Sequence, residues 1–171
     1  HEGRYRITRV YEGQNWNPGL RAPLTEPGVD ARVGDHLISV NGRPVAAGEN
    51  LYAAFEDTAG RQVEIVLSAN ASGEPARTMT VVPLSSDGEL RRRAWIEDNR
   101  RRVDDLSGGR LAYVYMPNTG GEGQAAFDRD YYSQIGKAGL ILDERYNGGG
   151  KVADYVISVL SRKPMCYWMT R

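Results

Sequence analysis

The sequence is poor in the residues that build disulfide frameworks and metal centres. Its 171 residues include one cysteine, Cys166, and two histidines, His1 and His36. A single cysteine excludes an internal disulfide and argues against a structural zinc site. We therefore expect a reducing, cytoplasmic setting, with no bound metal and no cofactor.

Charge of one sign and long apolar runs are also missing. The 22 basic and 22 acidic side chains cancel, which argues against a nucleic-acid partner or an anionic membrane surface. No apolar stretch approaches the roughly 18 residues of a membrane-spanning helix, and no signal peptide is recognisable. Because the chain opens with His1 and ends at Arg171 just inside an expected strand, we interpret it as an excised piece of a larger protein.

The first half has the residue pattern of a small β unit. Strands are expected at residues 5–11, 37–40, 63–67 and 78–84. The dipeptide Asn41-Gly42 supplies the positive φ angles of a tight hairpin turn. Asn50 is expected to cap a short helix that carries Leu51 and Phe55 on one face. Together these elements predict a barrel-like β unit with one short helix.

Beyond residue 86 the apolar period changes from about two to about 3.6 residues, which indicates helices. Ser86 and Glu89 fit a capping box for a helix to about Leu106, whose six arginines and five acidic residues indicate a solvated face. Further elements are expected as a strand at 111–116, a helix around 127–135, a strand at 140–142, a helix to 160 and a strand near Met165. This order implies parallel strands with right-handed crossovers. A sheet of about three strands leaves an exposed edge, which favours dimerisation, strand exchange or disorder near the C-terminus.

Residues 140–150, LILDERYNGGG, carry the strongest functional signal. The apolar run predicts a buried strand that ends in charged residues and then in Gly148, Gly149 and Gly150, whose amides no side chain covers. Apolar periodicity resumes at Val152 and indicates a helix directly after the glycines. Amides at a helix N-terminus are unsatisfied donors at the positive end of the dipole, and are suited to hold developing negative charge. An ordinary tight turn between strand and helix is an equally good interpretation of the pattern alone.

The same glycines also fit a dinucleotide-binding pattern, G-x-G-x-x-A, from Gly148 to Ala153. Three charged residues end the preceding strand, however, and no acidic residue follows at the expected distance of about 20 positions. A phosphate-binding loop of the Walker type fails because Val152, not serine or threonine, follows Lys151. Dinucleotide binding is therefore the weaker alternative.

Two segments resemble known families. Residues 22–45, APLTEPGVDARVGDHLISVNGRPV, have the Pro-Gly, Gly-Asp and Asn-Gly pairs of the PDZ module in its circularly permuted bacterial form. Residues 89–117 and 140–164 resemble the start of the catalytic core of tricorn-type serine peptidases, relatives of the carboxyl-terminal processing proteases with a crotonase-like α/β core. The resemblance implies a PDZ domain over residues 1–86, followed over 87–171 by the truncated N-terminal part of the peptidase core.

The resemblance implies acyl transfer by a serine nucleophile in a cytoplasmic, homo-oligomeric endopeptidase that cleaves peptides or unfolded polypeptides. The histidine base is expected upstream and the nucleophile downstream of this chain, so the fragment itself is expected to be inactive. A glycine amide of the Asp-x-Arg-x-Asn-x-Gly-Gly block is expected in the oxyanion hole, with Gly149 favoured over its neighbours Gly148 and Gly150. The supporting residues are Asp143, Arg145, Asn147 and Gly150, with an ion pair between the first two. Glu144 departs from the aliphatic residue usual in the family.

The PDZ resemblance also implies capture of an extended peptide by strand addition. Tyr5, Arg6 and Ile7 would form the edge of the groove, and Leu51 and Phe55 its pockets. The alternative is a docking or scaffolding module without catalysis. We expect His36 to be partly exposed and not catalytic, and Cys166 to be a buried, inert thiol.

Overall fold

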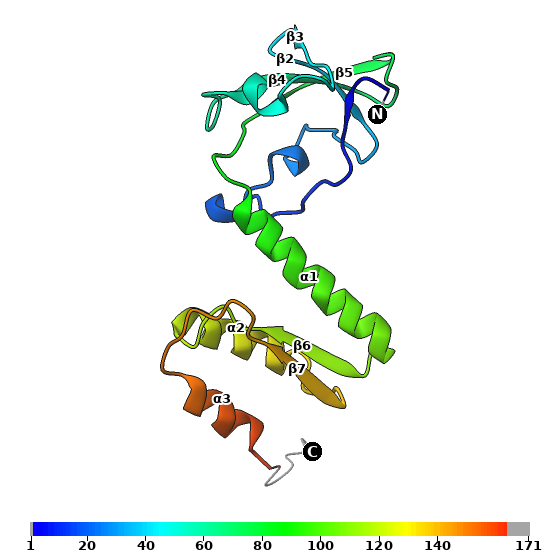
Figure 1. The fold of residues 1–171 in the computed structure, drawn as a ribbon. Coiled ribbons are helices and arrows are strands. Elements are labelled where there is room, and N and C mark those ends of the chain that lie inside the picture. Colours follow the sequence, from blue (N-terminus) through cyan, green and yellow to red (C-terminus); the bar gives the residue numbers. More distant parts are fainter. Residues whose placement is uncertain (1, 164–171) are drawn as a thin grey trace, which may run out of the picture. The chain divides into compact units, whose positions relative to one another are not determined.

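A computed structural model describes residues 2–163 of the chain. Cys166 and the strand expected near Met165 lie outside the described residues. The chain divides into two compact units, His1–Ala94 and Trp95–Arg171 (Figure 1). This division falls within helix α1 (Gly88–Ser107).

One antiparallel sheet frames the first unit. Its strands are β1 (Tyr5–Arg6), β2 (His36–Val40), β3 (Arg43–Pro44), β4 (Val63–Ser68) and β5 (Ala76–Val81). They follow the order β1-β2-β4-β5, with β3 paired to β2 (Figure 1). Within residues 2–163 the end strands β1 and β5 do not pair, so the sheet is open and the expected barrel is wrong. A closed barrel needs tilted strands long enough to meet around it, and β1 has two residues.

A turn and a helix cap that the sequence predicted are both present in the first unit. Asn41 and Gly42 have φ angles of 47° and 75°, and they join β2 to β3 through the pair Val40 and Arg43. The side chain of Asn50 accepts a hydrogen bond from the amide of Tyr52, 3.1 Å away. It thereby caps the helix η3 (Leu51–Phe55), which is a 3₁₀ helix and not an α-helix. Two further 3₁₀ turns, η1 (Pro18–Leu20) and η2 (Pro23–Thr25), lie in the long segment between β1 and β2.

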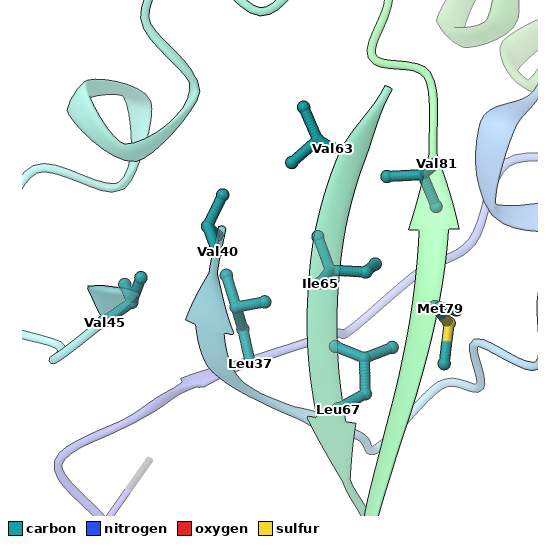
Figure 2. Packing of buried hydrophobic residues seen from close by; sticks show 8 residues of the cluster. All are labelled: Leu37, Val40, Val45, Val63, Ile65, Leu67, Met79 and Val81. Atoms are coloured by element: carbon teal, nitrogen blue, oxygen red, sulfur yellow. The ribbon is translucent and has the colours of Figure 1, made fainter. Parts of the chain in front are cut away.

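The core of the first unit lies on one face of this sheet. Side chains alternate along β4 from Val63 to Leu67, so that Val63, Ile65 and Leu67 all point inward (Figure 2). The full cluster comprises Leu37, Val40, Val45, Val63, Ile65, Leu67, Met79 and Val81. Burying apolar side chains of this kind stabilises a domain by about 1.5–3 kcal/mol each. The cluster therefore provides the main stabilisation of the first unit.

The second unit contains two parallel strands and their helices. Its elements after α1 are β6 (Leu111–Tyr115), α2 (Gly121–Tyr132), β7 (Gly139–Asp143) and α3 (Ala153–Leu160). β6 and β7 pair in parallel from Leu111 opposite Gly139 to Tyr115 opposite Asp143, as the alternation of elements predicted. Its core among the described residues comes from β6, the residue directly after it, α2 and α3, namely Val114, Met116, Phe127, Val156 and Val159. The described residues thus contain a two-stranded parallel layer.

Two local predictions for the second half are wrong. β7 is not fully buried: Ile141 is 41% exposed, because its side chain points to the face opposite Leu140 and Leu142, which pack against the core cluster. Ser86 and Glu89 do not form the expected capping box. The Ser86 hydroxyl accepts from the amide of Gly88 at 3.2 Å, while the Glu89 carboxylate pairs with Arg92 at 2.8 Å.

Candidate functional site

The triglycine loop, Gly148–Gly150, has a backbone that requires glycine. Gly149 and Gly150 have φ angles of 84° and 146°, a region that residues with a Cβ avoid. A Cβ on Gly150 would lie 2.1 Å from both the carbonyl carbon and oxygen of Thr119. A Cβ on Gly149 would meet nothing within 4 Å. Gly150 is therefore constrained by close backbone contact as well as by its φ angle.

That contact comes from a segment we call the backing loop, residues 117–120, which follows β6. The amide of Gly148 donates to the Pro117 carbonyl at 3.0 Å, and the amide of Thr119 donates to the Gly149 carbonyl at 2.9 Å. The amide of Val152 donates to the Thr119 carbonyl at 2.9 Å. Thr119 and Gly150 form an isolated parallel bridge. Backbone hydrogen bonds therefore hold the triglycine loop on both sides.

The sequence did not identify the backing loop as part of the site. Its letters, PNTG, indicate a turn after a strand. They do not identify which other loop the turn contacts, because that partner lies about 30 residues further along the chain. Only the parallel pairing of β6 with β7 brings the two loops together.

The three glycine amides differ in their hydrogen bonds. The Gly148 amide donates to Pro117, and the Gly149 amide donates to the Asn147 side-chain oxygen at 2.7 Å. The Gly150 amide has no hydrogen-bond partner within residues 2–163. The expectation of three bare amides is therefore corrected: the parallel pairing and the Asn147 side chain use two of them, and the third remains available.

Asp143, at the end of β7, forms the ion pair that the sequence predicted. The Arg145 Nε atom lies 2.9 Å and 3.1 Å from the two carboxylate oxygens of Asp143. The Arg145 amide donates to the same carboxylate at 3.0 Å. The Tyr113 hydroxyl donates to the same carboxylate at 2.6 Å. Asp143 is 7% exposed, and the hydrogen bonds from Arg145 lower its pKa to about 2 despite burial.

The pKa of Tyr113 moves in the opposite direction. Burial and the neighbouring carboxylate both raise it, because each disfavours the phenolate. Tyr113 therefore remains a hydrogen-bond donor and Asp143 remains an ionised acceptor near neutral pH. This arrangement orients the start of the loop and leaves neither group suited to proton transfer.

Trp95, on α1, is a further residue of this region that sequence reasoning missed. The Arg145 guanidinium lies over its indole ring, 4.7 Å from the ring centroid. The indole also makes edge contacts with Tyr115 at 5.1 Å and Tyr146 at 6.1 Å between ring centroids. The aromatic pattern of α1 gave no indication of this contact, because Arg145 is 50 positions away in the sequence.

The residues predicted to bind peptide lie together in the first unit. β1 is an end strand of the sheet, with Tyr5 opposite Leu37. The Ile7 amide donates to the Asp35 carbonyl at 2.8 Å. Because bonded and non-bonded pairs alternate in an antiparallel ladder, the peptide groups of Arg6 face away from β2.

The apolar members of this group pack inward. The side chains of Tyr5, Ile7, Leu51 and Phe55 are partly buried against the core cluster. The Tyr5 hydroxyl donates to the Glu49 carbonyl at 2.6 Å, which ties β1 to the segment before η3. β1 therefore offers mainly its backbone edge to a ligand.

His36 is buried, at 5% exposure, and the expectation of a partly exposed side chain is wrong. Its neighbour Leu37 points into the core, so His36 lies on the opposite face of β2. There it lines a hollow of 560 Å³ together with Arg6 and the loop of residues 69–72.

Within residues 2–163 no group of three or more histidine, cysteine, aspartate or glutamate side chains is placed to hold a metal ion. None of the helices described there is long and apolar enough to span a bilayer.

Comparison with known proteins identifies the first unit. A family model of the tricorn protease PDZ domain matches residues 1–86. The chain is 36% identical over 162 residues to tricorn protease homolog 1 of Streptomyces coelicolor. It is 34% identical over 163 residues to the tricorn protease of Thermoplasma acidophilum. Each alignment covers 95% of this chain.

A solved structure of the tricorn protease extends the similarity to the second unit. It matches with a TM-score of 0.83 and 33% identity, covering 99% of this chain and 16% of that protein. The chain therefore belongs to the tricorn protease family. It spans about 15% of the length of the curated relatives described above.

Proposed function

We propose that this chain is part of a cytoplasmic serine endopeptidase that hydrolyses peptides or unfolded polypeptides, and that it supplies one donor of the oxyanion hole. The observation that carries this proposal is the Gly150 amide, which is unpartnered within residues 2–163 in a loop held on both sides by backbone hydrogen bonds. In the proposed reaction a serine hydroxyl adds to the scissile carbonyl, the amine leaves, and water then hydrolyses the acyl-enzyme. The nucleophile and the histidine base are contributed from outside these residues.

Gly150 is the preferred donor because it can act without rearrangement. Use of Gly149, the residue favoured by the sequence, requires its amide to leave the Asn147 side chain. Use of Gly148 requires a break from the Pro117 carbonyl. An oxyanion-hole donor lowers the barrier most when it is already oriented, by about 3 kcal/mol.

A chimera tests this assignment. The matching segment of Streptomyces coelicolor tricorn protease homolog 1 is replaced by this chain, and peptide hydrolysis is measured. Glycolic acid incorporated at position 150 replaces the N–H group by an ester oxygen without adding a Cβ. The same replacement at position 149 is the matched control. We expect kcat to fall about 100-fold to 1,000-fold at 150 and much less at 149; the reverse order would assign the donor to Gly149.

The chain alone provides the complementary test. It should hydrolyse no peptide and should not be labelled by a fluorophosphonate that reacts with activated serines. Labelling at a serine of this chain would contradict the placement of the nucleophile outside it.

For the first unit we propose peptide docking by strand addition at β1. Arg6→Pro removes the outward-facing N–H at an edge position where proline is tolerated, and Arg6→Ala is the matched control for loss of the side chain. Titration with C-terminal peptides should show binding that Arg6→Pro abolishes and Arg6→Ala retains. Absence of binding to the unmodified chain would contradict docking and favour a bracing role.

We further propose that the parent enzyme is a homo-oligomer and that the isolated chain dimerises through the outer edge of β7. Within residues 2–163 β7 pairs with β6 on one side only, and its Ile141 side chain is exposed; both support this proposal, because an uncovered edge strand with apolar side chains favours pairing. Light scattering should show a dimer that Ile141→Lys converts to a monomer. A monomeric unmodified chain would contradict the proposal.

A further inference from the structure

We propose that Asn118 is a positioning residue for the triglycine loop. Its side chain fixes the backing loop, whose carbonyls take up the amides of Gly148 and Val152 and leave that of Gly150 available. Its role in catalysis rests on the proposed oxyanion function of Gly150, whereas its role in positioning does not.

The side chain of Asn118 is anchored at the start of α2. Its oxygen accepts hydrogen bonds from the amides of Gly120 at 2.9 Å and Gly123 at 3.0 Å. Its nitrogen donates to the Glu122 carboxylate at 3.1 Å. Helix N-terminal amides lack intrahelical partners, so one side chain satisfies two of them and joins the backing loop to the helix.

Close backbone packing makes this anchor specific. A Cβ on Gly123 would lie 1.6 Å from the Asn118 carbonyl oxygen, and a Cβ on Gly120 would lie 3.1 Å from its side-chain oxygen. The backing loop therefore lies directly against the first turn of α2. Glycine at these positions permits the approach, and the Asn118 hydrogen bonds maintain it.

The anchored backing loop then determines how the glycine amides are used. Pro117 and Thr119 flank Asn118, and their carbonyls accept from Gly148 and Val152. These bonds fix the residues on both sides of Gly150. Without the Asn118 cap the two carbonyls would move, and the direction of the Gly150 N–H would no longer be set.

Amide hydrogen exchange of the full 171-residue chain tests the positioning role. Asn118→Ala should raise the exchange rates of the Gly148 and Val152 amides by about tenfold. The amides of the β6–β7 ladder should change by less than about threefold. Asn50→Ala, which removes a similar cap from η3, is the matched control and should leave the Gly148 and Val152 rates unchanged.

Variants that keep or restore the hydrogen bonds of the Asn118 side chain should restore slow amide exchange. Asn118→Asp keeps the oxygen that accepts from Gly120 and Gly123, and its combination with Glu122→Gln restores the side-chain bond with donor and acceptor exchanged. This double variant should exchange within about twofold of the unmodified chain. Asn118→Ser, which can keep one cap, should be intermediate and serves if the alanine variant does not fold.

Three results would overturn the proposal: unaltered exchange of the Gly148 and Val152 amides in Asn118→Ala, equal acceleration across the β6–β7 ladder, which indicates general destabilisation, or failure of the double variant to restore slow exchange. In the chimera described above, Asn118→Ala should lower kcat more than it changes KM. Altered loop exchange with unchanged kcat would retain the positioning role and count against Gly150 as the oxyanion donor. Loss of kcat on ester replacement at 150, without altered exchange in Asn118→Ala, would retain the donor and reject Asn118.

Discussion

Each unit contains a buried aspartate held by an arginine, but the two arrangements act over different distances. In the first unit Asp35 directly precedes β2 and accepts from Arg77 on β5 at 2.5 Å and from the amide of Arg32 at 2.8 Å. In the second unit Asp143 is held by Arg145, two residues further along, and by Tyr113. The Asp35 arrangement joins β5 to the segment before β2. The Asp143 arrangement fixes the direction in which the chain continues after the end of β7.

The apolar cores differ in the same way. The first unit buries a cluster of eight side chains on one face of an antiparallel sheet (Figure 2). Among residues 95–163 of the second unit, the corresponding cluster has five side chains, contributed by β6, α2 and α3 and the residues next to them. Its functional loop depends on backbone bonds between segments far apart in sequence. Within residues 2–163 the first unit therefore has the larger apolar cluster, whereas backbone hydrogen bonds hold the functional loop of the second.

Cavities in the two cores give the largest expected effect and test whether the units are independent. Leu67 and Phe127 are both fully buried. Leu67→Ala should lower the free energy of unfolding by about 2–5 kcal/mol, and Phe127→Ala by about 3–5 kcal/mol. Hydrogen exchange should locate the first effect in the β4–β5 ladder and the second in the β6–β7 ladder. Equal acceleration in both ladders for each variant would show that the units unfold together.

Alanine substitutions in the triglycine loop compare Gly150, which lies against the Thr119 backbone, with Gly149, which has open space around it. Gly150→Ala should cost roughly 3 kcal/mol, because the new Cβ would require Thr119 to move. Gly149→Ala has space around its Cβ and should cost about 1 kcal/mol for its positive φ alone. Chemical denaturation followed by a probe in the second unit measures both. Equal costs would contradict the close contact between Thr119 and Gly150.

The acid dependence of stability isolates the Asp143 arrangement. Its pKa is lowered from 3.8 to about 2 in the folded chain, so its contribution is present above pH 4 and is lost as the pH falls toward 2. We expect this contribution to be about 1–2 kcal/mol, since solvent around the exposed Arg145 screens the pair. Asp143→Asn should flatten this part of the stability profile, and Tyr113→Phe should flatten it less. Unchanged acid profiles in both variants would exclude the arrangement as a source of acid sensitivity.

Local features of the fold could be predicted from the sequence because their causes are local. The Asn41-Gly42 turn, the Asn50 cap and the pairing of Asp143 with Arg145 each depend on residues close together in the chain. The order of helices and strands in the second half followed from apolar periodicity. The open sheet did not follow, because strand closure depends on the length of β1 and on which strands are neighbours.

The candidate site was predictable only in part for the same reason. The glycines of the triglycine loop marked its position, yet the sequence could not show which amides were used internally. The acceptors of the Gly148 and Gly149 amides are Pro117 and Asn147, and Pro117 lies beyond the end of a different strand, β6. His36 was misjudged because its exposure depends on a loop, residues 69–72, that lies beside it only in the folded sheet.

Trp95 offers the smallest expected effect and tests how Arg145 is held. Replacement by phenylalanine keeps an aromatic face for the guanidinium, whereas replacement by leucine removes it. Trp95→Leu should cost about 1 kcal/mol through lost cation–π and edge contacts, and Trp95→Phe about half as much. Arg145 side-chain NMR signals should broaden in the leucine variant, while the Asp143 contribution at low pH persists, because the carboxylate bonds do not involve the indole. Loss of that acid dependence in Trp95→Leu would mean that the indole, and not the carboxylate alone, determines where the guanidinium lies.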